Sequence, residues 1–304
     1  MRLPNRNKKP RGLQLKTTGL MNFSDYKKKR YVFSYGVLIA LLIIFIFIAL
    51  VPFIWLFISS FKTPAELGSS EYHLFPAKWD FTVFIDIWQK CGLTDIFINT
   101  LVVVIGGVIC AVIFNSLLAY AIAILKPVGY KVVDKLVLLA YMIPSALAIY
   151  PLMLAIMNSG ITNFSPYLPL CLVFGANAYY YMLFKNYFEK LPASLIEAAR
   201  IDGLSNLKIF FKVVVPLAKP IIGVVAIFAM TAAYSDYLLP YLIVGTKSSE
   251  YWTLMVAIFN FSSDVEVAPY LLQLLVLSII PQIIIFIIFQ KQIMNTSVNS
   301  GMKE

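Results

Sequence analysis

The segment 189–216 carries the side chains best suited to contacting another protein, because small and charged residues lie close together in it. Ser194 and Glu197 have the spacing of a capping box, in which each side chain accepts a hydrogen bond from the other residue's backbone amide. Gly203 can adopt the left-handed conformation that ends a helix. The spacing therefore predicts a short helix that stops at Gly203, and Ser205 can begin a second one.

Two functions are open for this short helix on its residues alone. Leu195, Ala198 and Ala199 fall on one face, and small side chains let another surface approach closely. Charged residues surround that face, namely Glu197, Arg200 and Asp202. A docking helix needs such a face, but an ordinary amphipathic surface helix also has one. The second helix is expected to run to Val215, with Pro216 marking the start of the next apolar stretch.

Catalytic chemistry finds little support in the residue pattern. The chain contains one histidine, His73, and three cysteines whose spacing fits neither a metal site nor a disulfide framework. It has no G-x-x-x-x-G-K-[ST] segment, which holds the phosphates in P-loop ATPases. We therefore expect no catalytic residue, no metal site, no cofactor and no ATP hydrolysis by this chain.

The elements that position these residues are expected to be membrane-spanning helices. Of the 304 residues, 60% are hydrophobic and 13% are charged, against about 25% charged in a soluble domain. A helix needs roughly 20 apolar residues to cross the bilayer core. The expected fold is an all-α integral membrane domain over 31–290, with six transmembrane helices at about 35–61, 97–125, 133–157, 167–188, 217–244 and 270–290.

The basic residues predict the orientation in the membrane. Of the 25 Lys and Arg, 21 lie in the N-terminal arm 1–30, in alternate loops and in the tail 291–304. Positive residues remain on the cytoplasmic side, so both termini and the segment 189–216 are expected there. The net charge of +10 is concentrated in the arm, where attraction to anionic membrane lipid explains it without a nucleic-acid partner.

A substrate pathway is expected near Asp236, which lies inside a predicted span. A carboxylate within the membrane is costly and by default faces a cavity or a partner. Tyrosines combine an aromatic ring with a hydrogen-bonding hydroxyl, which suits sugars, although most tyrosines in spans pack or anchor at the interface. The candidates beside Asp236 are Tyr180, Tyr234 and Tyr237, followed by Tyr179 and Tyr181.

The segment 189–216 resembles the EAA loop of binding-protein-dependent ABC importer permeases. That loop has Glu-Ala-Ala, three residues, Gly, nine residues, an aliphatic residue, one residue and Leu-Pro. The matching residues are Glu197-Ala198-Ala199, Gly203, Val213 and Val215-Pro216, with Val in place of the usual Ile and Leu. The resemblance implies a type I ABC importer permease fold. It also implies an ATPase-coupling element formed by Glu197, Ala198, Ala199, Arg200, Asp202, Gly203 and Pro216.

Further short matches are similar to the permeases of maltose-type carbohydrate importers. They are Asn99-Thr100-Leu101, Leu118-Ala119-Tyr120-Ala121, and Met142-Ile143-Pro144 with Pro151. The resemblance implies a sugar or oligosaccharide as substrate and a bacterial cytoplasmic membrane as the location. It implies as partners a cytoplasmic ATPase dimer that hydrolyses ATP, a second homologous permease subunit and an extracytoplasmic solute-binding protein.

Two alternatives belong to other classes. An ABC permease could carry a non-sugar solute such as a peptide, an amino acid or phosphate. An ion-coupled secondary transporter would work alone, but such proteins usually hold several polar groups at mid-membrane and show internal repeats. The sequence shows Asp236 and no repeat, so it favours the ABC permease.

Overall fold

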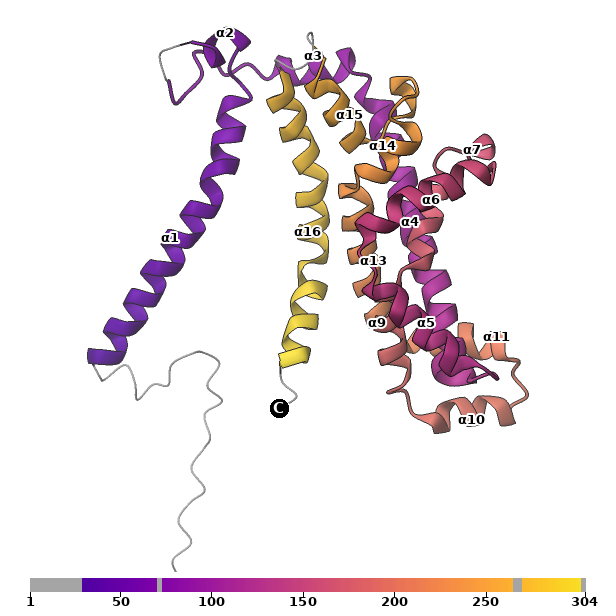
Figure 1. Ribbon diagram of the computed structural model, residues 1–304. Coiled ribbons are helices and arrows are strands. Elements are labelled where there is room, and N and C mark those ends of the chain that lie inside the picture. The colour runs from indigo at the N-terminus through magenta and orange to yellow at the C-terminus, as the bar shows by residue number, and fades with distance from the viewer. Residues whose placement is uncertain (1–28, 70–72, 265–269, 302–304) are drawn as a thin grey trace, which may run out of the picture. The chain divides into compact units, whose positions relative to one another are not determined.

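The computed structural model describes residues 29–69, 73–264 and 270–301, and every regular element in these ranges is helical (Figure 1). The chain divides into two compact units, Met1–Phe57 and Ile58–Glu304. Of the predicted arm 1–30, residues 1–28 lie outside the described residues, as do the last three residues of the predicted tail 291–304. The all-α class predicted from the sequence is confirmed.

The first unit contains one long helix, α1 (Lys29–Ser59), which reaches the next unit at its end. Its apolar part from Phe33 to Ser59 is long enough to cross a membrane. This helix corresponds to the predicted span 35–61. Pro52 lies inside it, which membrane helices tolerate better than soluble ones.

The segment after α1 is organised by Glu66. Two short helices lie here, α2 (Pro64–Leu67) and α3 (Thr82–Lys90). Thr63 and Glu66 form a capping box at the start of α2, and the second carboxylate oxygen of Glu66 accepts a 2.8 Å hydrogen bond from the Ala77 amide. Hydrogen bonds from two backbone amides hold the pKa of Glu66 below its usual value, and the Thr63 amide contributes more than the Ala77 amide.

Helix α4 (Leu93–Tyr120), continued by the π-helix η2 (Ala121–Leu125), is the element against which most of the second unit packs. Gly106 and Gly107 allow close contact on one of its faces. A Cβ at residue 106 would lie 2.5 Å from Cys171 Sγ, and one at residue 107 would lie 3.0 Å from the ring of Phe174. Small residues are what membrane helices use to approach this closely.

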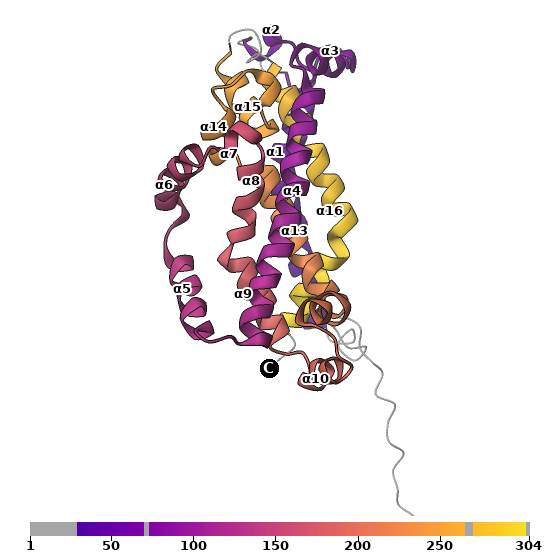
Figure 2. The same ribbon diagram turned by 90° about the vertical axis from the view of Figure 1, so that its right-hand side faces the viewer.

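The next part of the chain is broken in two places. Helices α5 (Tyr130–Met142) and α6 (Ser145–Asn158) meet at an angle of 109°, and Figure 2 shows them as an arch beside α8 and α9. After α7 (Ile161–Phe164), the predicted span 167–188 consists of three pieces. They are α8 (Leu168–Val173), η3 (Phe174–Ala176) and α9 (Ala178–Phe188).

The Asn115 side chain joins α4 to the break before α9. Its amide nitrogen donates to the Phe174 carbonyl at 2.9 Å, and its amide oxygen accepts from the Asn177 backbone at 3.1 Å. The side chain of Asn177 in turn caps α9 by accepting from the Tyr180 amide. The Phe174 carbonyl and the Asn177 and Tyr180 amides are therefore bonded within the protein, as lipid requires.

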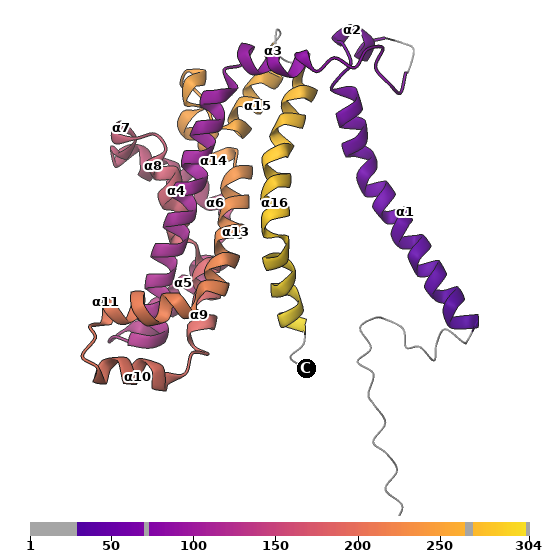
Figure 3. The same ribbon diagram turned by 180° about the vertical axis from the view of Figure 1, so that it is seen from behind.

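The C-terminal part returns through further broken helices. The segment after α9 forms α10 (Ala193–Ile201), α11 (Asn206–Ile209), η4 (Phe210–Val214) and α12 (Val215–Leu217). The elements after it are α13 (Lys219–Ser235), α14 (Leu238–Val244), η5 (Ser249–Tyr251), α15 (Leu254–Ser262) and α16 (Leu271–Gly301). Helices α10 and α11 lie at the opposite end of this unit from α3 and α15 (Figure 3).

Among the described residues, three helices are long and apolar enough to cross a membrane, and five spans result if each of two bent pairs counts as one. The three are in α1, in α4 with η2, and in α16. The bent pairs are α5 with α6, and 206–217 with α13. The predicted span 167–188 contributes no continuous helix of this length, because the chain breaks at η3.

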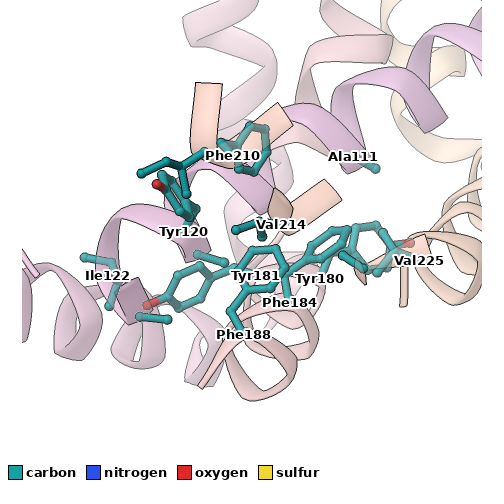
Figure 4. Close-up of a cluster of buried hydrophobic side chains, with 14 of the residues drawn as sticks. Ala111, Tyr120, Ile122, Tyr180, Tyr181, Phe184, Phe188, Phe210, Val214 and Val225 are labelled. Carbon is teal, nitrogen blue, oxygen red and sulfur yellow. The ribbon is translucent and has the colours of Figure 1, made fainter. Parts of the chain in front are cut away.

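The largest buried cluster among the described residues is formed by α4, η2, α9, α10, α11, η4 and α13, and Figure 4 shows part of it. Its large members include Tyr120, Tyr181, Phe184, Phe188 and Phe210, all 3% exposed or less. Residues from α10 and η4 share this cluster with residues from α9. The short helices of the segment 189–216 are thereby packed against the membrane helices.

We expect Gly106→Ala to lower the stability of the protein by about 1–3 kcal/mol, because the new methyl group overlaps Cys171 Sγ. Thermal unfolding of the purified protein in detergent measures the change. Gly223→Ala is the matched control, since nothing lies within 4 Å of a Cβ there. Adding Cys171→Ala to Gly106→Ala should restore part of the loss, and equal melting temperatures for both glycine variants would contradict the close contact.

Candidate functional site

Helix α10 begins two residues earlier than the sequence predicts. Pro192 is its N-cap, with extended backbone angles of φ −60° and ψ 122°, and no side chain caps the helix. Ser194 is therefore already helical, so the predicted capping box between Ser194 and Glu197 is wrong. The proline fixes its own φ and starts the helix without a serine cap.

The end of α10 confirms the predicted stop at Gly203. This glycine has φ +77°, and its amide donates to the Arg200 carbonyl at 3.0 Å. The Leu204 amide donates to the Ala199 carbonyl at 3.1 Å. These two bonds form a Schellman motif, which requires the left-handed residue that glycine supplies.

The exposed face of α10 differs in one residue from the expected one. Ile196 and Ala199 are buried in the cluster below the helix. Leu195 and Ala198 are exposed. The sequence predicts Ala199 on the same face, but it is buried on the opposite side. The spacing of three residues between Ile196 and Ala199 places both on the inner side. Ile201 is 87% exposed at the end of the helix, where an apolar side chain is open to a partner.

Charged side chains border this exposed face. Glu197, Arg200 and Asp202 are all exposed. A groove of about 390 Å³ lies between α10 and the ends of α9 and η2. Its lining is formed by Ala123, Ile124, Lys126, Phe188, Glu189, Leu191, Ala193, Ile196, Glu197 and Arg200. The helix thus presents small, apolar and charged groups beside a concave surface.

The segment following Gly203 holds α10 against the bundle. Ser205 is the N-cap of α11 as predicted, although its side chain makes no capping hydrogen bond. The Tyr120 hydroxyl donates to the Asn206 carbonyl at 3.0 Å, and the Tyr120 ring contacts Phe210 at 5.2 Å. The start of this segment is therefore attached directly to the end of α4.

Pro216 is expected at the start of the next membrane span, but it lies in the short helix α12. The chain bends by 82° after Leu217, and the long helix α13 begins at Lys219. Ala218 forms the bend and Pro220 stands in the first turn of α13. The long helix thus begins two residues after the predicted start at about 217, and Pro216 and Pro220 each stand in the first turn of a helix, where proline is favoured.

Asp236 lies at a break between two helices. It follows the last residue of α13, and its backbone is extended, with φ −70° and ψ 124°. The backbone amides of Leu238 and Leu239, at the start of α14, lie near its carboxylate. A carboxylate beside a helix N-terminus is stabilised by the helix dipole, which suits its position inside the predicted span.

The candidate tyrosines divide into buried and accessible groups. The Tyr234 hydroxyl donates to the Ser278 carbonyl at 2.6 Å, and the Tyr181 hydroxyl donates to Asp134 at 2.8 Å. Tyr180 is 4% exposed within the main cluster. Tyr237 is half-buried and its ring contacts Tyr241 and Phe259. Tyr179 is exposed, so these two rings remain the accessible ones.

Two ionisable residues were not singled out from the sequence. Asp134 and Lys185 lie in the predicted spans 133–157 and 167–188 and form an ion pair of 2.6 Å. The signal that could have found them is the same one that marked Asp236, a charged residue inside a span. Within the described part of the chain, no three His, Cys, Asp or Glu residues could hold a metal ion.

The fold and the site together define a class of protein. Several apolar helices form a membrane domain, and a short helix with a glycine stop packs at one end of it. This is a permease subunit of the type I ABC importer fold. Residues 107–295 match the family described as "Binding-protein-dependent transport system inner membrane component", and the chain belongs to this family.

Individual relatives cover nearly the whole chain. The diacetylchitobiose uptake system permease protein NgcG of Streptomyces coelicolor is 30% identical over 86% of both chains. The galactooligosaccharides transport system permease protein GanQ of Bacillus subtilis is 29% identical over 92% of this chain and 99% of its own. The structure is similar to a crystal structure of a bacterial ABC transporter for the import of alginate. The TM-score is 0.71 and the identity 26%, over 90% of this chain and 99% of that one.

We expect Tyr234→Phe to lower the free energy of unfolding by about 1 kcal/mol, because the Ser278 carbonyl loses its donor. Thermal unfolding in detergent measures the loss. Tyr150→Phe serves as the control, since Tyr150 is 62% exposed. If Tyr234→Phe instead left the melting temperature unchanged while weakening substrate binding, Tyr234 would contact the substrate rather than α16.

Proposed function

We propose that the chain is the membrane-spanning subunit of an ATP-driven importer that moves a sugar or oligosaccharide delivered by an extracytoplasmic binding protein. The observation that carries the proposal is α10, a short helix with a glycine stop and an exposed border of charged and apolar groups, in a chain of this permease family. The names of NgcG and GanQ, both permeases for oligosaccharides, support the substrate class.

The proposed mechanism begins at α10 and passes to the helices packed against it. The exposed face of α10 docks into a cytoplasmic ATPase subunit, and closure of the ATPase dimer moves α10 and the helices packed against it. The residues that contact the ATPase are Glu197, Ala198, Arg200 and Asp202. The helix is held in place by Ala199 and Gly203. The connection to α13 contains Pro216. A second, homologous permease subunit completes the pathway.

The chain itself is not proposed to be an enzyme. Its sequence has no P-loop, so ATP hydrolysis is assigned to the partner subunit. Both termini and α10 lie in the cytoplasm in this proposal, which the distribution of basic residues supports. Lipid surrounds the apolar helices, and no nucleic acid is involved.

The substrate pathway is proposed to pass the break at Asp236. Tyr237 offers an accessible aromatic ring beside this break, whereas Tyr234 and Tyr180 support the pathway from behind as packing residues. Broken helices at mid-membrane are common at transporter binding sites. An ABC permease for a non-sugar solute is the second candidate, and a sugar-binding measurement distinguishes the two.

The first experiment co-expresses the chain with its chromosomal neighbours, purifies it under mild detergent and measures which proteins co-elute and whether ATP is hydrolysed. Co-elution with an ATPase and a second permease, followed by ATP-dependent sugar uptake in proteoliposomes, is the expected result. A lone protein that transports solute in liposomes without ATP would establish the secondary transporter instead.

We expect Gly203→Asp to abolish uptake while the protein remains in the membrane in normal amount, because the left-handed stop of α10 is lost. Gly160→Asp is a closely matched control. Gly160 has φ +71°, against +77° at Gly203, and a Cβ at either residue meets nothing nearer than 3.8 Å. Both changes cost about 1–2 kcal/mol of backbone strain, so normal uptake by Gly203→Asp, or equal loss in both variants, would count against docking through α10.

A further inference from the structure

Helix α5 contacts the rest of the second unit through a narrow stripe of its surface. No residue of α5 is fully buried, and only Tyr130, Asp134 and Val137 are not exposed. Tyr141 continues the same stripe, since its ring stacks on Tyr179 with centroids 6.4 Å apart. These four residues follow the helical spacing of three and four, so they lie on one face.

The middle of this stripe is charged. One carboxylate oxygen of Asp134 accepts from the Tyr181 hydroxyl at 2.8 Å, and the other pairs with Lys185 Nζ at 2.6 Å. The Asp134 and Lys185 side chains are 20% and 19% exposed, so water screens the pair only weakly. We call Asp134, Tyr181 and Lys185 the Asp134 cluster, and it joins α5 to α9.

Helix α9 leads directly to the docking helix. Lys185 lies one turn before the end of α9 at Phe188, and Glu189, 3.7 Å from Lys185, follows that end. Phe188 shares the main buried cluster with Ile196 and Ala199 of α10. Because cores pack densely, α9 and α10 move together when either is displaced.

The other end of α5 reaches the sharpest bend in this part of the chain. Met142 ends α5, Ile143 and Pro144 have extended backbone angles, and α6 leaves at 109°. Pro144 has no amide proton to donate to the last turn of α5, so the junction lacks a hydrogen bond that a continuous helix would have, and the two helices can change their mutual angle here.

We propose that the Asp134 cluster is the positioning link that makes α5 follow α9, so that a displacement of α10 reaches the bent pair α5–α6. This inference rests on the proposed function, and it assigns Asp134, Tyr181 and Lys185 a role in coupling rather than in contacting substrate. An ion pair suits this role because both oxygens of one carboxylate are held by two side chains, which fixes direction as well as distance.

The test uses the complete transporter in proteoliposomes and measures sugar taken up per ATP hydrolysed. Asp134→Asn keeps the shape of the side chain but removes the charge, and Lys185→Met removes the partner charge. The double variant Asp134→Lys with Lys185→Asp exchanges the two charges. Asp80→Asn is the control, because it removes the same charge from an ion pair that joins no two helices. Asp80 pairs at 2.9 Å with Lys78, an exposed residue two positions earlier in the chain.

Each single variant is expected to lower uptake per ATP by about tenfold while ATP hydrolysis continues. The exchanged double variant should recover uptake per ATP to within about threefold of the unaltered protein, and Asp80→Asn should leave it unchanged. Unchanged uptake per ATP in both single variants would overturn the inference. Equal loss of uptake and hydrolysis, with no recovery in the double variant, would also overturn it.

A second measurement does not depend on transport. The double variant Tyr141→Cys with Tyr179→Cys places one thiol on α5 and one on α9. Oxidative cross-linking of the two thiols reports whether the helices stay together. Each variant with only one of these substitutions measures the background from the native cysteines. The cross-linking yield should be the same with and without ATP, and adding Asp134→Asn should make it lower and dependent on ATP. A yield unaffected by Asp134→Asn overturns the inference.

The two proposals fail separately in these experiments. If the unaltered chain assembles with no ATPase and takes up no sugar, the proposed function fails. The inference fails instead when the unaltered transporter works and the Asp134 and Lys185 variants couple ATP to uptake normally. A cross-linking yield that depends on Asp134 supports the link between α5 and α9 in either case.

Discussion

The arrangement of this bundle depends on how the broken backbone around residues 174–177 is hydrogen-bonded. Lipid offers no donors or acceptors, so a break inside a span must be satisfied by the protein itself. Asn115, only 2% exposed on α4, supplies one donor and one acceptor to that break. The direction of α9 is fixed there, and α9 carries both the connection to α10 and the two side chains that bond to Asp134 of α5.

Features that the sequence could predict are those set by local chemistry. The length of an apolar stretch decides whether a helix can span a membrane, so α1, α4 and α16 coincide with expected spans. The left-handed conformation at Gly203 needs no distant partner, and the stop of α10 was predictable for that reason. The family resemblance likewise rested on a continuous segment of the sequence.

Features set by distant partners could not be predicted in this way. The break in 167–188 is stabilised by Asn115, which lies 59 residues before Phe174 in the chain. The Asp134–Lys185 pair joins residues 51 apart. Tyrosine orientation is equally non-local, because each break changes the rotational position of the helix after it. Tyr180 and Tyr181 consequently face the core, whereas the neighbouring Tyr179 faces outward.

The two π-helical segments, η2 and η4, bear on how the length of this chain can change. η2 continues α4 and η4 continues α11, and a π-turn holds one more residue than the α-turn it replaces. The extra residue is contained in that one turn, so deleting it would restore an α-turn while the helix on either side keeps its path. Tyr120 precedes η2 and Asn206 precedes η4, so their 3.0 Å hydrogen bond involves a residue of neither turn. A deletion of one residue is therefore tolerated better within η2 and η4 than elsewhere in these helices.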